Sequence, residues 1–170
     1  NVVWARGLWT VNPEGTFAWN TSLEYDVFKP ACVDQSGNIY VGGLNSYDLN
    51  GKARWSASVT GKLVTQIAIG QYGIIFFGNV THNWGAGYQH EVFAVSADGA
   101  TVWKYLFGTT QDERDYLFAS GPVVDPGGVI YICSDDGRIE AITVEGKLKW
   151  RYRTNDEFSR SRSSILVGID

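Results

Sequence analysis

Residues 121–153 read GPVVDPGGVIYICSDDGRIEAITVEGKLKWRYR, and the organisation of the whole chain can be worked out from this stretch. Short runs of β-branched and aromatic residues alternate with clusters of Asp, Gly and Pro, which is typical of strands joined by tight turns. The apolar residues do not recur with the roughly 3.6-residue period of a helix. The stretch therefore predicts four consecutive strands, at 121–125, 129–134, 138–144 and 147–153.

The last of these strands carries a Gly-x-x-x-Trp motif that recurs through the chain. An acidic residue or Asn precedes each Gly, as in turns where Gly supplies a positive φ. Four strands in a repeat of about 40–48 residues is the sequence pattern of a β-propeller blade. The four copies of the motif are Gly15–Trp19, Gly51–Trp55, Gly99–Trp103 and Gly146–Trp150.

Two earlier segments match the same pattern and predict two more complete blades. The expected strands are 29–34, 38–43, 46–49 and 52–58 in the first blade, and 63–69, 73–79, 91–97 and 101–107 in the second. The two ends of the chain supply a fourth blade between them. Its expected strands are Val2–Ala5, Leu8–Val11 and Thr16–Asn20 at the head, and Ser163–Asp170 at the tail.

The sequence thus predicts an all-β chain, a single domain over residues 1–170, with four blades of four antiparallel strands. Three arrangements satisfy this strand count. The chain could close on itself as a four-bladed ring whose last blade is shared by the N- and C-termini. Two chains could form a homodimer that completes an eight-bladed ring. The chain could also be an excerpt of a longer propeller, since its sequence contains no Met.

Composition narrows the classes of partner. The 170 residues carry a net charge of −4, which argues against a nucleic-acid binder, because such proteins are normally basic. No apolar run approaches the roughly 18 residues of a membrane-spanning helix. Cys32 and Cys133 follow no zinc or redox spacing, so they are expected to be two buried thiols or, alternatively, one disulfide. The sequons at Asn20 and Asn79 would permit N-glycosylation.

The repeat also resembles a known family. Pro122-x-x-Asp125, Gly128-x-Ile-Tyr131 and Glu145-Gly-Lys-Leu-Lys-Trp150 are similar to the PQQ-like repeat. This repeat builds the blades of pyrroloquinoline-quinone alcohol dehydrogenases, of BamB-like outer-membrane assembly lipoproteins and of many extracellular propellers. The resemblance implies a secreted, periplasmic or cell-surface location. It also implies that a recurrent Trp packs between blades, here Trp19, Trp55, Trp103 and Trp150.

Three connections are longer than the repeat requires, at 80–90, 108–120 and 154–162, and all should emerge on one face of the propeller. Long loops on a rigid scaffold are where binding residues concentrate. These loops hold both histidines of the chain together with aromatic and charged side chains, a combination suited to a glycan, a peptide or an anionic ligand. An exposed hairpin whose aromatic rings pack on one another is the alternative interpretation. The candidate binding residues are His82, Trp84, Tyr88, His90, Asp112, Arg114, Asp115, Tyr116, Arg160 and Arg162.

The most direct functional prediction is a non-catalytic binding or scaffold module that uses this loop face for a protein, glycan or small ligand. No catalytic residue, metal site or resident cofactor is predicted. The alternative is a cofactor-binding half or fragment of a PQQ-dependent dehydrogenase. By resemblance, such an enzyme would hold PQQ with Ca²⁺ and would often carry two adjacent cysteines, which this sequence lacks.

Overall fold

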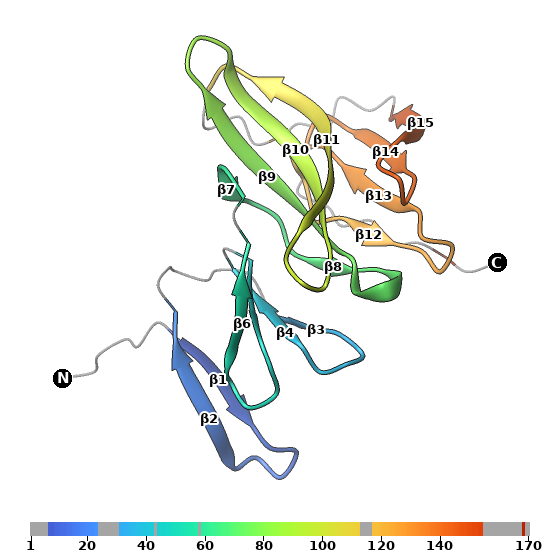
Figure 1. The fold of residues 1–170 in the computed structure, drawn as a ribbon. Coiled ribbons are helices and arrows are strands. Elements are labelled where there is room, and N and C mark those ends of the chain that lie inside the picture. Colours follow the sequence, from blue (N-terminus) through green and yellow to red (C-terminus); the bar gives the residue numbers. More distant parts are fainter. Residues whose placement is uncertain are drawn as a thin grey trace. The chain divides into compact units, whose positions relative to one another are not determined.

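The computed structural model describes residues 7–23, 31–42, 44–57, 59–112, 117–154 and 168. They fall into two compact units, Asn1–Ala57 and Ser58–Asp170, each of which is built from antiparallel sheets (Figure 1). Among the described residues, none forms a helix of the length and apolar character needed to cross a bilayer.

The first unit contains a hairpin and a four-stranded sheet. The hairpin pairs β1 with β2, and the sheet has the order β3-β4-β5-β6. In the core of this unit, Ile39, Val41 and Tyr47 of the sheet pack against Leu8 and Trp19 of the hairpin. The strands are β1 (Gly7–Val11), β2 (Phe17–Ser22), β3 (Cys32–Val33), β4 (Ile39–Val41), β5 (Asn45–Tyr47) and β6 (Ala53–Ser56).

The second unit contains two sheets. One has the order β11-β10-β9-β7, with β8 also paired to β9, and the other has the order β12-β13-β14-β15. The first of these strands are β7 (Lys62–Leu63), β8 (Ala68–Ile69), β9 (Ile75–Asn83), β10 (Gly87–Val95) and β11 (Thr101–Thr110), with the short 3₁₀ turn η1 (Gln71–Gly73) before β9. The others are β12 (Val123–Val124), β13 (Ile130–Cys133), β14 (Arg138–Ile142) and β15 (Leu148–Arg153).

The apolar residues that alternate along these strands form the core between the two sheets of the second unit. Phe76, Val92 and Phe107 of one sheet are buried against Ile130 and Ile142 of the other. Strands with one apolar face bury that face by stacking sheet on sheet, as expected of propeller blades. The all-β class, and the strand order predicted for 29–58 and 121–153, are confirmed.

One detail of the sequence prediction was wrong, and for another the structure shows the alternative interpretation. The segment 80–90, expected to be a binding loop or, alternatively, an exposed hairpin whose aromatic rings pack on one another, continues β9 and β10 as a hairpin of paired strands, because its alternating side chains suit a pleated ladder. The strand expected at 63–69 is instead two short strands, β7 and β8, which pair with different parts of β9. The strand expected at Val2–Ala5 and nearly all of Ser163–Asp170 lie outside the described residues.

Two tryptophans join neighbouring elements in the same way. The Trp19 indole N–H donates to the carbonyl of Leu49 at 2.7 Å, and its ring lies over Gly51, where a Cβ would be 2.6 Å away. In the second unit, Trp103 donates to Val144 at 2.7 Å. We call this arrangement a tryptophan dock. Glycine is needed under the ring, as at Gly51, for two reasons. This residue adopts a positive φ, and its missing side chain makes room for the indole ring.

An Asp-to-Tyr contact closes the turn between the first two strands in two of the sheets. Asp34 accepts the Tyr40 hydroxyl at 2.8 Å, and Asp125 accepts the Tyr131 hydroxyl at 2.9 Å. Burial raises the pKa of Asp34, but the hydrogen bonds from Asn38, Tyr40 and Ser36 lower it by more. The pKa of Asp34 therefore lies below its ordinary value. The recurrent Asp is therefore a charged turn-former.

Asn79 of the second sequon is completely buried, and its side-chain Nδ2 donates to the Thr60 carbonyl at 2.7 Å. Asn20 of the first sequon is exposed on β2. Both cysteines are thiols, with Cys133 buried and Cys32 half-buried. The expectation of two thiols is the one that the structure supports.

Candidate functional site

The sheet β7–β11 is longer at one end than the sheet β12–β15. The two sheets can be aligned through their registers, because Trp103 pairs with Ala94 as Trp150 pairs with Ala141. In this alignment the last residue of β13 corresponds to Gly78, where β9 still has five residues to run. We call the additional part the hairpin extension. It consists of Asn79–Asn83, Gly87–Glu91 and Leu106–Thr110; its β9 and β10 parts form the green hairpin tip in Figure 1, beside the yellow end of β11.

The side chains of the hairpin extension alternate between its two faces. His82 is paired with Tyr88, and Val80 with His90. Because directly paired residues point to the same side of a sheet, these four share one face. Further down the strands, that face continues through Val92 into the core against β13 and β14. The predicted binding residues of β9 and β10 therefore extend the inter-sheet face beyond the end of its partner sheet.

Three rings form a cluster at the tip of this face. The centroid of the His82 ring is 4.8 Å from that of Trp84 and 4.6 Å from that of Tyr88, with the His82 and Tyr88 rings stacked. Trp84, in the turn, keeps 93% of its surface exposed. The cluster thus holds a large aromatic surface in water on a paired-strand support.

The base of the face is closed by a buried histidine. His90 is only 2% exposed, and its Nε2 lies 3.1 Å from Thr110 Oγ1. Since Thr110 gives its one hydroxyl hydrogen to the Asp112 carbonyl, the His90 Nε2–H is the donor to Thr110. Phe118 covers His90 at 5.7 Å and stacks on Phe107 at 5.1 Å. These contacts fix the hairpin extension to the rest of the unit.

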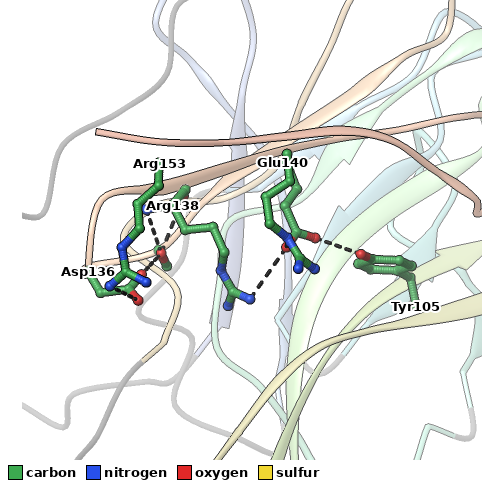
Figure 2. Close-up of polar contacts among 7 residues, drawn as sticks. Tyr105, Asp136, Arg138, Glu140 and Arg153 are labelled. Atoms are coloured by element: carbon green, nitrogen blue, oxygen red, sulfur yellow. Dashed lines mark hydrogen bonds and ion pairs between the residues drawn. The ribbon is translucent and has the colours of Figure 1, made fainter. Parts of the chain in front are cut away.

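A buried carboxylate joins the two sheets just below the hairpin extension (Figure 2). Glu140 is fully buried, and its carboxylate accepts hydrogen bonds from Tyr105 and from the Arg151 Nε, each at 2.7 Å. The Arg138 guanidinium is 3.4 Å away. Burial and the bond to Glu140 raise the pKa of Tyr105, which keeps its hydroxyl protonated as a donor. Such pairing is what a buried charge requires.

Arg138 also contacts the base of the hairpin extension. Its guanidinium carbon lies 4.3 Å from the centre of the Phe107 ring, a cation–π contact. Beside it, Asp136 accepts from Ser134 and pairs with Arg153 at 3.2 Å. Burial raises the pKa of Asp136, but Ser134 and the two arginines lower it below its ordinary value. The turn of the shorter sheet is thus tied together by charged groups.

The structure brings only part of the predicted site together. His82, Trp84 and Tyr88 form the ring cluster, His90 lies buried beneath it, and Asp112 follows the end of β11. Five predicted residues lie outside the described residues: Arg114, Asp115, Tyr116, Arg160 and Arg162.

Sequence reasoning missed the charge cluster, although a signal was present. Arg138 and Glu140 alternate on one strand, Arg151 and Arg153 alternate on the next, and the turn at Gly146 sets their register. That register places all four side chains on one face. Within the described ranges, no group of three or more His, Cys, Asp or Glu residues could hold a metal ion.

Comparison with known proteins agrees with this architecture. The family model described as outer membrane protein assembly factor BamB matches residues 89–166. An uncharacterized protein, YxaL of Bacillus subtilis (strain 168), is 28% identical over 81 residues, which are 48% of this chain and 18% of that protein.

Two solved structures also share this fold. BamB from Moraxella catarrhalis superimposes with a TM-score of 0.61 and 26% identity, over 82% of this chain and 40% of that one. A protein of unknown function from Bacteroides caccae shares the fold, with a TM-score of 0.57 and 16% identity over 85% of this chain and 52% of that one. The chain therefore spans about half or less of the length of the proteins it matches. The match to the family model and the structural match to BamB together support the similarity of this chain to the PQQ-like, BamB-like repeat family and its β-propeller fold.

Proposed function

We propose that the chain is a non-catalytic binding module, which works outside the cytoplasm and uses the hairpin extension to bind a protein partner. The observation that carries this proposal is the ring cluster of His82, Trp84 and Tyr88 at the tip of the extension. Trp and Tyr are over-represented among the residues that dominate protein interfaces. Here Tyr88 lies on a paired strand, and Trp84 lies in the turn between the strands with its ring against that of His82, so binding would order few additional groups.

The support beneath the cluster is consistent with this role. His90 and Phe118 are packed under the tip, and the Glu140 cluster ties the same sheet to its neighbour. Binding sites on regular strands hold their side chains more accurately than sites on loops. The extension is thus built as a stiff projection.

The carboxylates of the second unit support the non-catalytic part of the proposal. Asp125 accepts a backbone N–H and a Tyr hydroxyl, and Glu140 accepts from Tyr105 and Arg151. Burial raises the pKa of Asp125, whereas these hydrogen bonds lower it below its ordinary value. Asp125, whose pKa is lowered in this way, is poorly suited to act as a general acid or base near neutral pH, and the Glu140 carboxylate is enclosed by structural partners.

The choice of a protein partner outside the cytoplasm rests on similarity. The matching family model is named as an outer membrane protein assembly factor, and the BamB structure covers 82% of this chain. This warrant is an analogy between folds, and the ring cluster gives it a specific surface to test.

The experiment is to pan a displayed random-peptide library on the immobilised chain and to titrate the selected peptide by calorimetry. Trp84→Ala should weaken that peptide about 30-fold or more, as expected for an interface residue worth roughly 2 kcal/mol. Trp9→Ala is the matched control, since Trp9 is also an exposed tryptophan, 58% exposed, on another sheet. It should leave the affinity unchanged.

Two results would overturn the proposal. Equal affinity of the peptide for wild type and Trp84→Ala would show that binding occurs elsewhere. Binding to an immobilised glycan array that depends on Trp84, with no peptide selected, would replace the protein partner by a carbohydrate.

A further inference from the structure

The ring cluster contains a side chain, that of His82, whose charge can change near neutral pH. Histidine is the residue type that ordinarily gains or loses its charge between pH 5 and 8. The His82 ring is stacked on Tyr88 at 4.6 Å and makes a T-shaped contact with Trp84 at 4.8 Å. The face of an aromatic ring attracts a cation within about 6 Å, so the stack on Tyr88 suits the charged imidazolium as well as the neutral ring. His82 can therefore carry a positive charge without leaving the cluster.

The other titratable groups on this face of the hairpin extension leave that charge uncompensated. On β10, Tyr88 and His90 belong to the face, and His90 is buried with its Nε2–H bonded to Thr110. On β11, Thr110 pairs with Tyr88, and Asp112 follows two residues later, with its carbonyl bonded to the Thr110 hydroxyl. Residues 79–91 contain no Lys or Arg.

The ion pair of the hairpin extension lies on its opposite face. Glu91 directly follows His90 on β10, so its side chain points to the other side of the sheet. Its carboxylate is 3.0 Å from the Lys104 Nζ, and the two charges compensate each other. Within the described part of the chain, His82 is thus the exposed group that can bring a positive charge to the ring cluster.

A charged His82 favours a particular chemistry in the partner. The exposed Trp84 ring offers apolar contact, and the imidazolium beside it would attract a carboxylate. A segment in which Asp or Glu neighbours an apolar residue matches both features. An exposed ion pair contributes little free energy, so the charge adjusts the affinity, while the aromatic contact supplies most of it.

We propose that His82 is a specificity residue of the ring cluster and that its charged form selects an acidic peptide segment of the protein partner. This inference rests on the proposed function, because it concerns the same surface. The acidic segment binds more tightly at pH 5.5, where His82 is charged, than at pH 8.0, where it is neutral. Trp84 contributes at both pH values.

The test is to pan the displayed random-peptide library separately at pH 5.5 and at pH 8.0. Peptides selected at pH 5.5 should be richer in Asp and Glu. The most enriched acidic peptide is then titrated by calorimetry, together with a counterpart in which Asn replaces Asp and Gln replaces Glu. Carboxylates of a peptide are charged at both pH values. The dissociation constant of the acidic peptide should rise about three- to fivefold from pH 5.5 to pH 8.0, and that of the counterpart should not change.

A matched pair of variants assigns the effect to one side chain. His82→Phe keeps a ring against Tyr88 but cannot take up a proton, so its dissociation constant for the acidic peptide should be the same at both pH values. Lys147→Gln removes one positive charge from an exposed position in the sheet β12–β15 and should keep the pH dependence of the wild type. Thermal unfolding of each variant at both pH values verifies that the fold is retained.

Three results would overturn the inference. They are an equal content of Asp and Glu in the peptides selected at the two pH values, an acidic peptide whose affinity does not change with pH, and a pH dependence that persists in His82→Phe. If binding still depended on Trp84 in these cases, the proposed function would stand and the inference alone would fail. A loss of Trp84 dependence at both pH values would instead overturn both.

Discussion

The two sheets of the second unit begin from the same repeat and end differently. In the sheet β12–β15 the strands stop at Cys133, and a short turn held by Ser134 and Asp136 leads straight into β14. In the sheet β7–β11 the strands continue into the hairpin extension, which displays Trp84 to solvent. The difference teaches that the repeated positions maintain packing between sheets, whereas the departure from the repeat creates an exposed surface.

The opposite ends of the same two sheets differ as well. Tyr131 corresponds to Phe76, since each pairs with the alanine that faces the blade tryptophan. The Tyr131 hydroxyl donates a hydrogen bond to Asp125. In the other sheet Gly70 occupies the position of Asp125, because Phe76 has no hydroxyl and needs no acceptor. The longer sheet thus lacks the charged turn of the shorter one.

The largest expected effect is at the dock that joins the two sheets. Trp103→Ala should lower the free energy of unfolding by about 4 kcal/mol, because it removes a large ring from between Phe76 and Gly146. Trp103→Phe keeps a ring but loses the hydrogen bond to Val144. The loss of that hydrogen bond should lower the free energy of unfolding by about 1 kcal/mol, in addition to the effect of the smaller ring. Urea denaturation of each variant measures both. Equal stability of wild type and Trp103→Ala would contradict the dock.

The next effect concerns the buried charge beneath the extension. Glu140→Gln should lower the free energy of unfolding by about 3 kcal/mol, because Arg138 and Arg151 lose their shared counter-charge. Arg153→Gln breaks a pair in which Arg153 is 68% exposed, and should cost at most about 1 kcal/mol. The same denaturation experiment compares them. If Arg153→Gln lowered the free energy of unfolding more than Glu140→Gln, the cluster around Glu140 would not be what joins the two sheets.

A smaller effect on stability depends on pH and concerns the turn at Asp125, whose counterpart in the longer sheet is the uncharged turn at Gly70. Since hydrogen bonds lower the folded-state pKa of Asp125, its charge stabilises the fold above about pH 4. That contribution is lost as the pH falls through the lower folded-state value. Asp125→Asn should therefore cost on the order of 1 kcal/mol at neutral pH and less near pH 3. Unfolding curves at the two pH values measure the difference. A cost that is equal at both would show that Asp125 acts without its charge.

The smallest expected effect is at the tip of the extension. Trp84→Ala should change the free energy of unfolding by less than about 0.5 kcal/mol, because Trp84 is 93% exposed. Thermal or urea unfolding would detect a larger loss. Such a loss would mean that the ring cluster supports the fold instead of being displayed to solvent.

Sequence reasoning predicted the repeated parts well for a physical reason. The Gly-x-x-x-Trp turns fix the register of β14 and β15, and a register error would move every apolar side chain to the wrong face. For the extension, a loop and an exposed hairpin both stayed open, because polar and aromatic residues at 80–90 resemble a loop in composition. Their pairing, such as His82 with Tyr88, becomes visible only when the two strands are aligned.

The candidate site was predictable to a lesser degree. His82, Trp84 and Tyr88 were found because they depart from the repeat. The buried Glu140 was missed because charged residues on a strand are usually expected to be solvated. Its environment depends on Tyr105 from a different sheet, 35 positions away, and no local pattern reports such a contact.

The hairpin extension also sets a rule for how this projection can change length over evolution. Side chains alternate along β9 and β10, so adding one residue to each strand would move the residues of the tip to the opposite face. Adding two residues to each strand would keep the ring cluster on its present side and only raise it. Natural or engineered lengthening of the projection should therefore proceed in steps of about four residues, two for each strand.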